Sequence, residues 1–192
     1  MPRLFTGLEV PPDIADALAT QRGGLPGARW IDPENYHVTL RFIGDIDDAL
    51  AREIALMLGQ VRRRAFEVRF DGLSSFGGRR PRAVIAAVVP TPPLIELQAE
   101  HERIMQRVGL EPEGRKFSAH VTLARLRDSS SRQVADYLAA RGPLNFLSFP
   151  VSRFVLFSSR ASVGGGPYVV EAAYPLATND RVGAQPFGAA PP

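Results

Sequence analysis

The 192-residue chain contains no cysteine, only one lysine and only three histidines. Without cysteine, the sequence excludes disulfide bonds, thiolate nucleophiles, zinc ribbons and iron–sulfur clusters. The single lysine, Lys116, lies in Arg115-Lys116-Phe117 and is not followed by the Asp-Gly expected of the nucleophilic lysine in an ATP-dependent ligase. Any catalysis in this chain therefore has to use imidazole and oxygen groups.

Long hydrophobic segments are also absent from the sequence. No apolar run approaches the ~18 residues that indicate a membrane span, and the opening Met-Pro-Arg-Leu-Phe lacks the layout of a signal peptide. Hydrophobic residues make up 45% of the chain, which suits one globular domain or two small lobes with a real core. We expect a monomeric cytoplasmic protein without membrane association.

The positive charge is carried almost entirely by arginine. The formal net charge is only +3, and of the 23 basic residues all but Lys116 are arginine. Arginine makes planar contacts to phosphate and stacks on bases, although a GC-rich genome gives the same bias. Arg62-Arg63-Arg64 is expected to be a solvated helix end, whereas the loop Arg79-Arg80-Pro81-Arg82 is a better candidate for contacting a substrate backbone.

Two of the three histidines begin the same tetrapeptide, His-Val-Thr-Leu, at residues 37–40 and again at residues 120–123. Each copy lies in an apolar, β-branched run that predicts a strand, where alternate side chains point to opposite faces. His37 and Thr39 should therefore share one face, and His120 and Thr122 should repeat the arrangement. If the two strands face one cleft, it holds two acid–base groups and two hydroxyl donors for an anion.

Periodicity along the chain predicts alternating strands and helices. We expect strands at residues 3–8, 36–43, 66–70, 82–89, 117–126, 153–158 and 168–174, an extended segment from Trp30, a glycine turn at 164–167, and helices at 13–21, 47–60, 93–108 and 131–141. This order and the 83-residue offset between the histidines favour the α+β class, with two similar lobes in one domain over residues 1–177. Residues 178–192 lack periodicity and are predicted to be disordered.

Several other residues receive expectations from pattern alone. Strict strand alternation places Arg41 on the face of His37, where it is a candidate phosphate contact. His101 has Glu100 and Glu102 beside it and is expected to be a solvated surface histidine. Phe76 and Trp30 are expected in the core.

The sequence resembles the two-histidine phosphoesterases, and within them the RNA 2′,3′-cyclic phosphodiesterases formerly described as 2′-5′ RNA ligases. The matching segments are Arg3-Leu4-Phe5, Arg29-Trp30, residues 34–44 around the first motif, Arg80-Pro81-Arg82, residues 109–114, and residues 120–125 around the second motif. Thr6-Gly7-Leu8 stands where that family often has Val-Ala-Ile, and Ala119 stands where a proline commonly precedes the second histidine.

The resemblance implies two pseudo-symmetric lobes, each an antiparallel sheet with helices, with the active site in the cleft between them. It implies that His37 is the general acid, that His120 is the general base and that a 2′-phosphate is the product. It also implies that Phe42 and Arg125, each five residues after a motif histidine, flank the nucleobase. Strict alternation would point both away from the cleft, so the strands must twist or end there. RNA or nucleotides ending in a 2′,3′-cyclic phosphate would be the substrates, and reversible 2′-5′ ligation is a further expectation.

Alternatives remain at this point. A metal hydrolase is disfavoured, because neither motif has helical i, i+4 histidine spacing or an acidic residue at ligand spacing, and we expect no metal and no cofactor. A non-catalytic RNA-binding module could use the same cleft, and another cyclic or 2′-5′-linked nucleotide could be the substrate. The motifs are identical, so spacing cannot assign acid and base. Two acting histidines predict a bell-shaped pH dependence with apparent pKa values bracketing neutrality.

Overall fold

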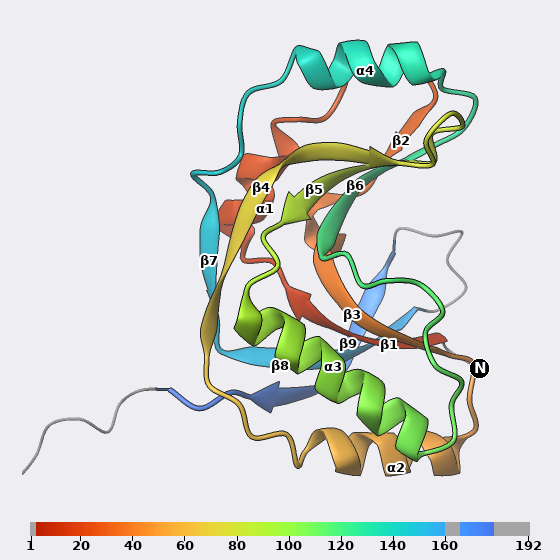
Figure 1. Ribbon diagram of the computed structural model, residues 1–192, viewed down its shortest axis with the longest axis vertical. Coiled ribbons are helices and arrows are strands. Elements are labelled where there is room, and N and C mark those ends of the chain that lie inside the picture. Colours follow the sequence, from red (N-terminus) through yellow and green to blue (C-terminus); the bar gives the residue numbers. More distant parts are fainter. Residues whose placement is uncertain (1–2, 160–165, 179–192) are drawn as a thin grey trace, which may run out of the picture.

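The computed structural model describes residues 3–159 and 166–178. Residues 179–192 of the predicted tail and residues 164–165 of the predicted glycine turn lie outside this range. The described elements are β1 (Arg3–Glu9), α1 (Pro12–Ala19), β2 (Ala28–Trp30), the 3-10 turn η1 (Pro33–Asn35), β3 (His37–Gly44), α2 (Asp48–Leu58), β4 (Phe66–Phe76), β5 (Ala83–Val88), α3 (Pro92–Arg107), β6 (His120–Leu126), α4 (Ser131–Ala139), β7 (Ser148–Val151), β8 (Arg153–Ser159) and β9 (Tyr168–Pro175) (Figure 1).

The described strands join into one antiparallel sheet, in the order β7-β4-β5-β6-β3-β1-β8-β9, with β2 paired to β6. The two motif strands, β3 and β6, are neighbours at its centre and pair only at Val38 and Val121. The strands β1, β8 and β9 extend from β3, while β5, β4 and β7 extend from β6. The α+β class is therefore confirmed, with the two halves of the sheet meeting at the motif strands.

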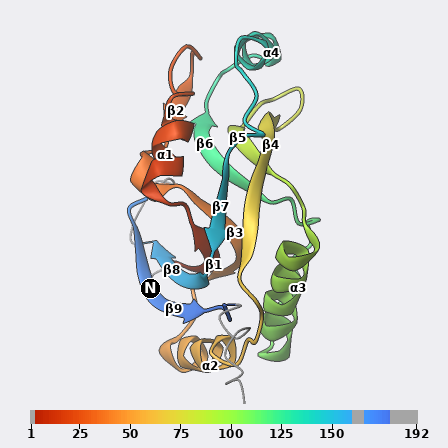
Figure 2. The same cartoon turned by 90° about the vertical axis from the view of Figure 1, so that its left-hand side faces the viewer.

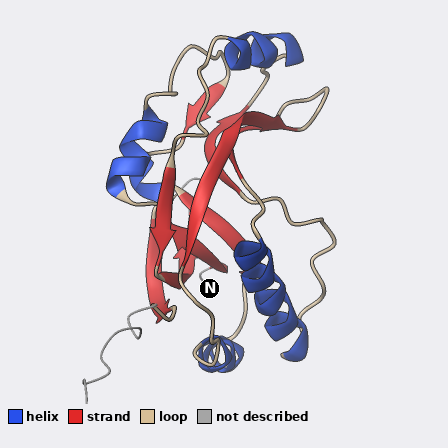
Figure 3. Cartoon of the chain, turned by 60° about the vertical axis from the view of Figure 1, so that its left-hand side comes forward, coloured by secondary structure: helices blue, strands red, loops and turns tan. Residues whose placement is uncertain are grey.

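Helices cover both ends and two opposite sides of this sheet. Helix α4 lies at one end of the molecule and α2 at the other, while α1 and α3 lie on opposite sides (Figures 2 and 3). Local chemistry explains where the helices begin: the Asp47 side chain accepts a hydrogen bond from Leu50 N before α2, and Ser130 and Gln133 form a reciprocal capping box at α4. No helix in the described ranges is long and apolar enough to cross a membrane.

Helix α3 packs beneath β1 and β3, on the face opposite to the motif histidines. His101 of α3 is 0% exposed, its Nδ1 lies 2.8 Å from Thr6 Oγ1, and its ring contacts Phe154 at 4.5 Å between centroids. The expectation of a solvated His101 was wrong, because its position on the helix faces inward and the acidic neighbours in sequence point elsewhere.

Most helices and strands lie where the sequence predicts them, but two strands differ from the prediction. Strand β7 was not predicted, and β4 extends to Phe76, well beyond the predicted end at residue 70. Phe76 is 37% exposed rather than part of the core, whereas Trp30 is partly buried against the core as expected.

Candidate active site

The two motif strands bring both histidines and both threonines to one place. Because β3 and β6 are antiparallel and register at Val38 and Val121, His37 and Thr122 lie one residue to one side of this pair, and Thr39 and His120 lie one residue to the other. Val38 and Val121 are fully buried, so the alternating neighbours project from the opposite face. The four predicted side chains therefore lie together.

His37 is held in one orientation by its own backbone. Its Nδ1 lies 2.9 Å from the carbonyl oxygen of Asn35, and its Nε2 lies 3.1 Å from Thr39 Oγ1. A carbonyl oxygen can only accept, so Nδ1 carries the proton and Nε2 of the neutral ring accepts from the Thr39 hydroxyl. When His37 is protonated, Nε2 becomes the donor, so this nitrogen is the one that exchanges a proton with a ligand.

His120 repeats this arrangement in the second half. Its Nδ1 lies 2.7 Å from the carbonyl oxygen of Ser118, again two residues earlier in the chain. The same tautomer follows, and its Nε2 is the nitrogen left for chemistry. The local conformation of the two motifs is thus equivalent, as their identical sequences predict.

The surroundings of the two histidine rings lower the pKa of both. Burial, chiefly, lowers the pKa of His37 to about 4; the Asn35 carbonyl opposes this in part, and the charges of His120 and Arg125 add to it. Burial also lowers the pKa of His120, with Ser118 O opposing and Arg125 contributing. Both rings are therefore neutral in the ligand-free site at neutral pH, and an anion bound between them would favour protonation.

A β-bulge in each motif strand changes which side chains face the site. In β3, Thr6 and Gly7 of β1 pair with Arg41 and Thr39, so Leu40 is the extra residue. In β6, Val84 and Ile85 of β5 pair with Ala124 and Thr122, so Leu123 is the extra residue. A bulge of this kind shifts the alternation by one position.

The bulges turn Phe42 and Arg125 to the histidine face. Phe42 is 54% exposed, and its ring lies 5.5 Å from that of Phe5, which in turn lies 5.0 Å from His37. Arg125 is exposed and close enough to lower the pKa of both histidines. Strict alternation would have pointed both side chains away.

Arg41 does not join the site. The bulge turns it to the core side, where it is 7% exposed, forms an ion pair with Glu102 of α3, and donates to the carbonyl oxygens of Phe42 and Glu111. The sequence prediction for Arg41 assumed unbroken alternation and was wrong for that reason.

Aromatic rings surround the two histidines, and alternation did not predict them. Tyr168 meets His37 edge-on at 4.8 Å between centroids, with Phe5 and Phe157 beside it. Phe76 meets His120 at 4.7 Å and an interplanar angle of 90°. Gly7 makes room for this packing, since a Cβ there would lie 3.2 Å from the Phe157 ring and 2.7 Å from Val38 O.

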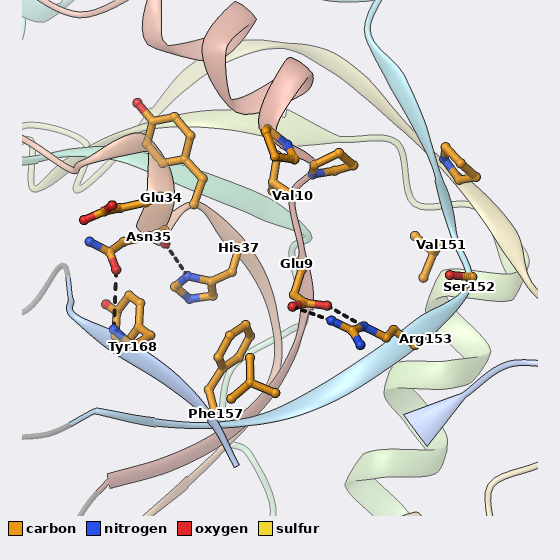
Figure 4. Close-up of a pocket in the computed structure, with 15 residues that line it drawn as sticks. Glu9, Val10, Glu34, Asn35, His37, Val151, Ser152, Arg153, Phe157 and Tyr168 are labelled. Atoms are coloured by element: carbon orange, nitrogen blue, oxygen red, sulfur yellow. Dashed lines mark hydrogen bonds and ion pairs between the residues drawn. The ribbon is translucent and has the colours of Figure 1, made fainter. Parts of the chain in front are cut away.

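A cavity of about 450 Å³ opens beside His37 (Figure 4). Asn35, His37, Phe157 and Tyr168 line one part of it, and an ion pair between Arg153 and Glu9 crosses another. His120 does not line it, so the cavity flanks the two-histidine site. Within the two described ranges, no group of three or more His, Asp or Glu side chains is placed to hold a metal ion.

The chain is similar in sequence to two relatives named RNA 2′,3′-cyclic phosphodiesterase and in fold to a solved structure of LigT. A relative from Aquifex aeolicus named RNA 2′,3′-cyclic phosphodiesterase is 30% identical over 147 residues, covering 74% of this chain and 78% of the relative. A relative of the same name from Aeropyrum pernix is 38% identical over 106 residues, covering 54% of this chain and 60% of the relative. The crystal structure of Escherichia coli LigT complexed with 3′-AMP superposes with a TM-score of 0.75 at 25% identity, covering 92% of this chain and 99% of LigT.

The match to a family extends through both halves of the molecule. The sequence pattern described as "LigT like Phosphoesterase" matches residues 8–86 and 88–168, one motif histidine in each segment. Together with the fold, this shows that the chain belongs to the LigT-like family of two-histidine phosphoesterases.

Proposed function

We propose that this protein is an RNA 2′,3′-cyclic phosphodiesterase that opens the cyclic phosphate to a 2′-phosphate. One observation carries the proposal: two histidines, each locked by a backbone carbonyl at Nδ1, present their Nε2 atoms to one face beside two threonine hydroxyls. The names of the relatives from Aquifex aeolicus and Aeropyrum pernix support the substrate class.

The reaction needs one proton removed and one proton supplied. Water attacks phosphorus, the P–O3′ bond breaks, and the 3′-hydroxyl and a 2′-phosphate monoester are left. His120 Nε2 takes the proton of the attacking water, and His37 Nε2 gives a proton to the departing O3′. The hydroxyls of Thr39 and Thr122 donate to the non-bridging oxygens, where negative charge grows in the transition state.

The different surroundings of the two rings support this division of roles. Nε2 of His37 already exchanges a hydrogen bond with Thr39, whereas no such bond occupies Nε2 of His120 in the described part of the chain. The free Nε2 can accept from water. His37, with the strongly lowered pKa, becomes a good proton donor once the substrate anion has favoured its protonated form.

Phe42 and Arg125 supply the site for the terminal base. Both are exposed on the histidine face after the bulges, one on each motif strand. An aromatic ring and a guanidinium plane stack on any base, so we expect broad base acceptance. A ribose 5′-hydroxyl in the place of water would form a 2′-5′ linkage by the same steps, which is the reversible ligation expected from the family.

The test is incubation with RNA ending in a 2′,3′-cyclic phosphate, in EDTA, followed by identification of the phosphate position. We expect metal-independent turnover to a 2′-phosphate, with the His37→Ala/His120→Ala protein as the inactive control. A 3′-phosphate product would show that the P–O2′ bond breaks and not the P–O3′ bond as proposed. Activity lost in EDTA and restored by a divalent ion would exclude the metal-independent mechanism.

A further inference from the structure

The turn between β4 and β5 carries basic and aromatic side chains that this mechanism does not use. Phe76 ends β4, and Arg79, Arg80 and Arg82 follow it; all four are exposed. None of the ion pairs within the described ranges includes any of these three arginines. The turn projects at the upper right of Figure 1, and we call these four residues the hairpin patch.

The hairpin patch is a fixed structure. Arg82 N donates to Phe76 O at 2.7 Å, and Arg80 N donates to Gly77 O at 3.0 Å. Gly77 has φ +108°, and a Cβ there would lie 2.2 Å from Arg80 O, so the turn requires glycine. The arginines are therefore presented by a defined backbone.

The hairpin patch adjoins the site through the sheet. Phe76 pairs with Ala83, Ala83 pairs with Arg125, and Arg125 pairs with Arg29, so these residues form one row across β4, β5, β6 and β2. Two strand spacings, about 10 Å, separate the backbones of Phe76 and Arg125. The Phe76 ring also contacts His120 directly. Phe76 thus contacts the proposed reacting group His120, and the three arginines follow Phe76 in the turn.

We propose that the hairpin patch binds the RNA segment immediately 5′ of the cyclic end, so that the enzyme prefers oligonucleotides to cyclic mononucleotides. The inference rests on the proposed function. With the terminal base between Phe42 and Arg125, the preceding base stacks on Phe76, and the backbone phosphates contact Arg79, Arg80 and Arg82. Arginines that follow a backbone beside an exposed ring are typical of single-strand recognition.

The experiment compares kcat/KM for adenosine 2′,3′-cyclic monophosphate and for an octaadenylate ending in the same cyclic phosphate. For the unmodified protein we expect at least a roughly tenfold preference for the octamer, since stacking of one base alone gives about five- to hundredfold. Arg79→Ser/Arg80→Ser should remove most of the preference and leave mononucleotide turnover unchanged. It should also make the salt dependence of octamer kcat/KM less steep, by roughly 0.7 in log–log slope per lost phosphate contact.

Matched variants separate this role from general charge and from packing. Arg52→Ser/Arg103→Ser removes the same charge from exposed positions on α2 and α3 and should keep the preference. Phe76→Leu should lower the octamer-to-mononucleotide ratio, while Phe76→Tyr, which keeps a ring, should restore it. The ratio cancels any effect of Phe76 on His120, and melting temperatures verify folding.

Each outcome decides between the two proposals. Equal kcat/KM for both substrates, or a preference unchanged by Arg79→Ser/Arg80→Ser, overturns the inference and leaves the proposed function intact. If neither substrate is turned over, the proposed function fails, and anisotropy with a fluorescein-labelled single-stranded RNA octamer then tests the patch. Equal affinity of the unmodified and Arg79→Ser/Arg80→Ser proteins overturns the inference there too.

Discussion

His37 and His120 have the same three following residues, yet their side chains have different neighbours. His37 lies among Phe5, Phe157 and Tyr168, while His120 is covered by Phe76. The carbonyl oxygens of Asn35 and Ser118 therefore set which ring nitrogen exchanges a proton, and the burial of each ring sets how readily that nitrogen takes one.

Removal of either imidazole should affect the rate more than binding. We expect His37→Ala and His120→Ala each to lower kcat by roughly 10²- to 10⁴-fold, because each removes one proton transfer from the transition state. Single-turnover kinetics with cyclic-phosphate RNA measure the rate, and titration with adenosine 2′-monophosphate measures binding. A near-normal rate in either variant would contradict the two-histidine mechanism.

The pH optimum of kcat/KM should lie on the acid side of neutrality, whereas the sequence alone predicts pKa values that bracket neutrality. Since burial lowers the pKa of both histidines, kcat/KM, which reports the free enzyme, should have its optimum below pH 7. The optimum of kcat should lie at higher pH, because bound phosphate favours the imidazolium. His120→Ala should remove the acidic limb of the residual activity, and His37→Ala the basic limb; exchanged limbs would reverse the assigned roles.

Arg125 should contribute to the position of that optimum, in addition to burial. Its charge lowers the pKa of both histidines, so Arg125→Gln should raise both pKa values and move the kcat/KM profile to higher pH. Arg127→Gln removes an exposed charge two residues later and serves as the control. Coincident profiles for Arg125→Gln and the unmodified protein would show that Arg125 is not coupled to the histidines.

At the scale of elements, the bulges in β3 and β6 determine which side chains face the site and which face the core. Regular alternation along the strands does not predict this. Arg41, released to the core side by the bulge, joins three segments: β3 through Phe42 O, α3 through Glu102, and the loop leading to β6 through Glu111 O. Glu102 also accepts from Glu113 N at 3.0 Å. This network connects the bulge of one motif strand with the approach to the other.

Breaking this network from one side should be costly. Arg41→Leu leaves the Glu102 carboxylate without its charged partner, and we expect a loss of about 3 kcal/mol in the free energy of unfolding. Arg41→Leu/Glu102→Leu should lose less than the sum of the single changes, because the unpaired charge is gone. Urea denaturation of the four proteins gives the coupling energy, with Arg52→Leu as the exposed control. Additive losses would show that the two side chains are independent.

At the scale of the whole molecule, stability should depend on pH through the buried histidines. Burial lowers the pKa of His101 to about 3 and that of His37 to about 4, both below the unfolded value near 6.5. The folded state thus prefers the neutral rings. The stabilisation is complete above about pH 6.5 and is lost as pH falls toward the folded values.

The lowered pKa of His101 alone should reduce the free energy of unfolding by about 2 kcal/mol when the pH falls from 7 to 5. Thr6→Val/His101→Phe removes the titrating ring together with the hydroxyl that bonds it, so the variant should lose less stability over this range. Urea denaturation at several pH values measures the slope. An unchanged slope would contradict proton linkage at His101.

The sequence alone determined the parts of this protein that depend on near neighbours in the chain. Alternation within each His-Val-Thr-Leu copy placed His37 with Thr39 and His120 with Thr122, because two residues along one strand share a face whatever pairs beside it. Apolar spacing likewise located the four helices and most strands. These features need no knowledge of the partner strand.

Tertiary structure decided the features that depend on what lies across from a residue. The bulges at Leu40 and Leu123 follow from register against β1 and β5. The bulge in β3 places Arg41 on the core side and Phe42 on the histidine face, the opposite of what strict alternation predicts. His101 became buried because α3 packs it onto Thr6 and Phe154. Burial and register are properties of pairs of distant segments, and a local pattern contains neither. For this reason the sequence predicted that each motif histidine shares a face with its threonine, but it did not predict which side chains surround them.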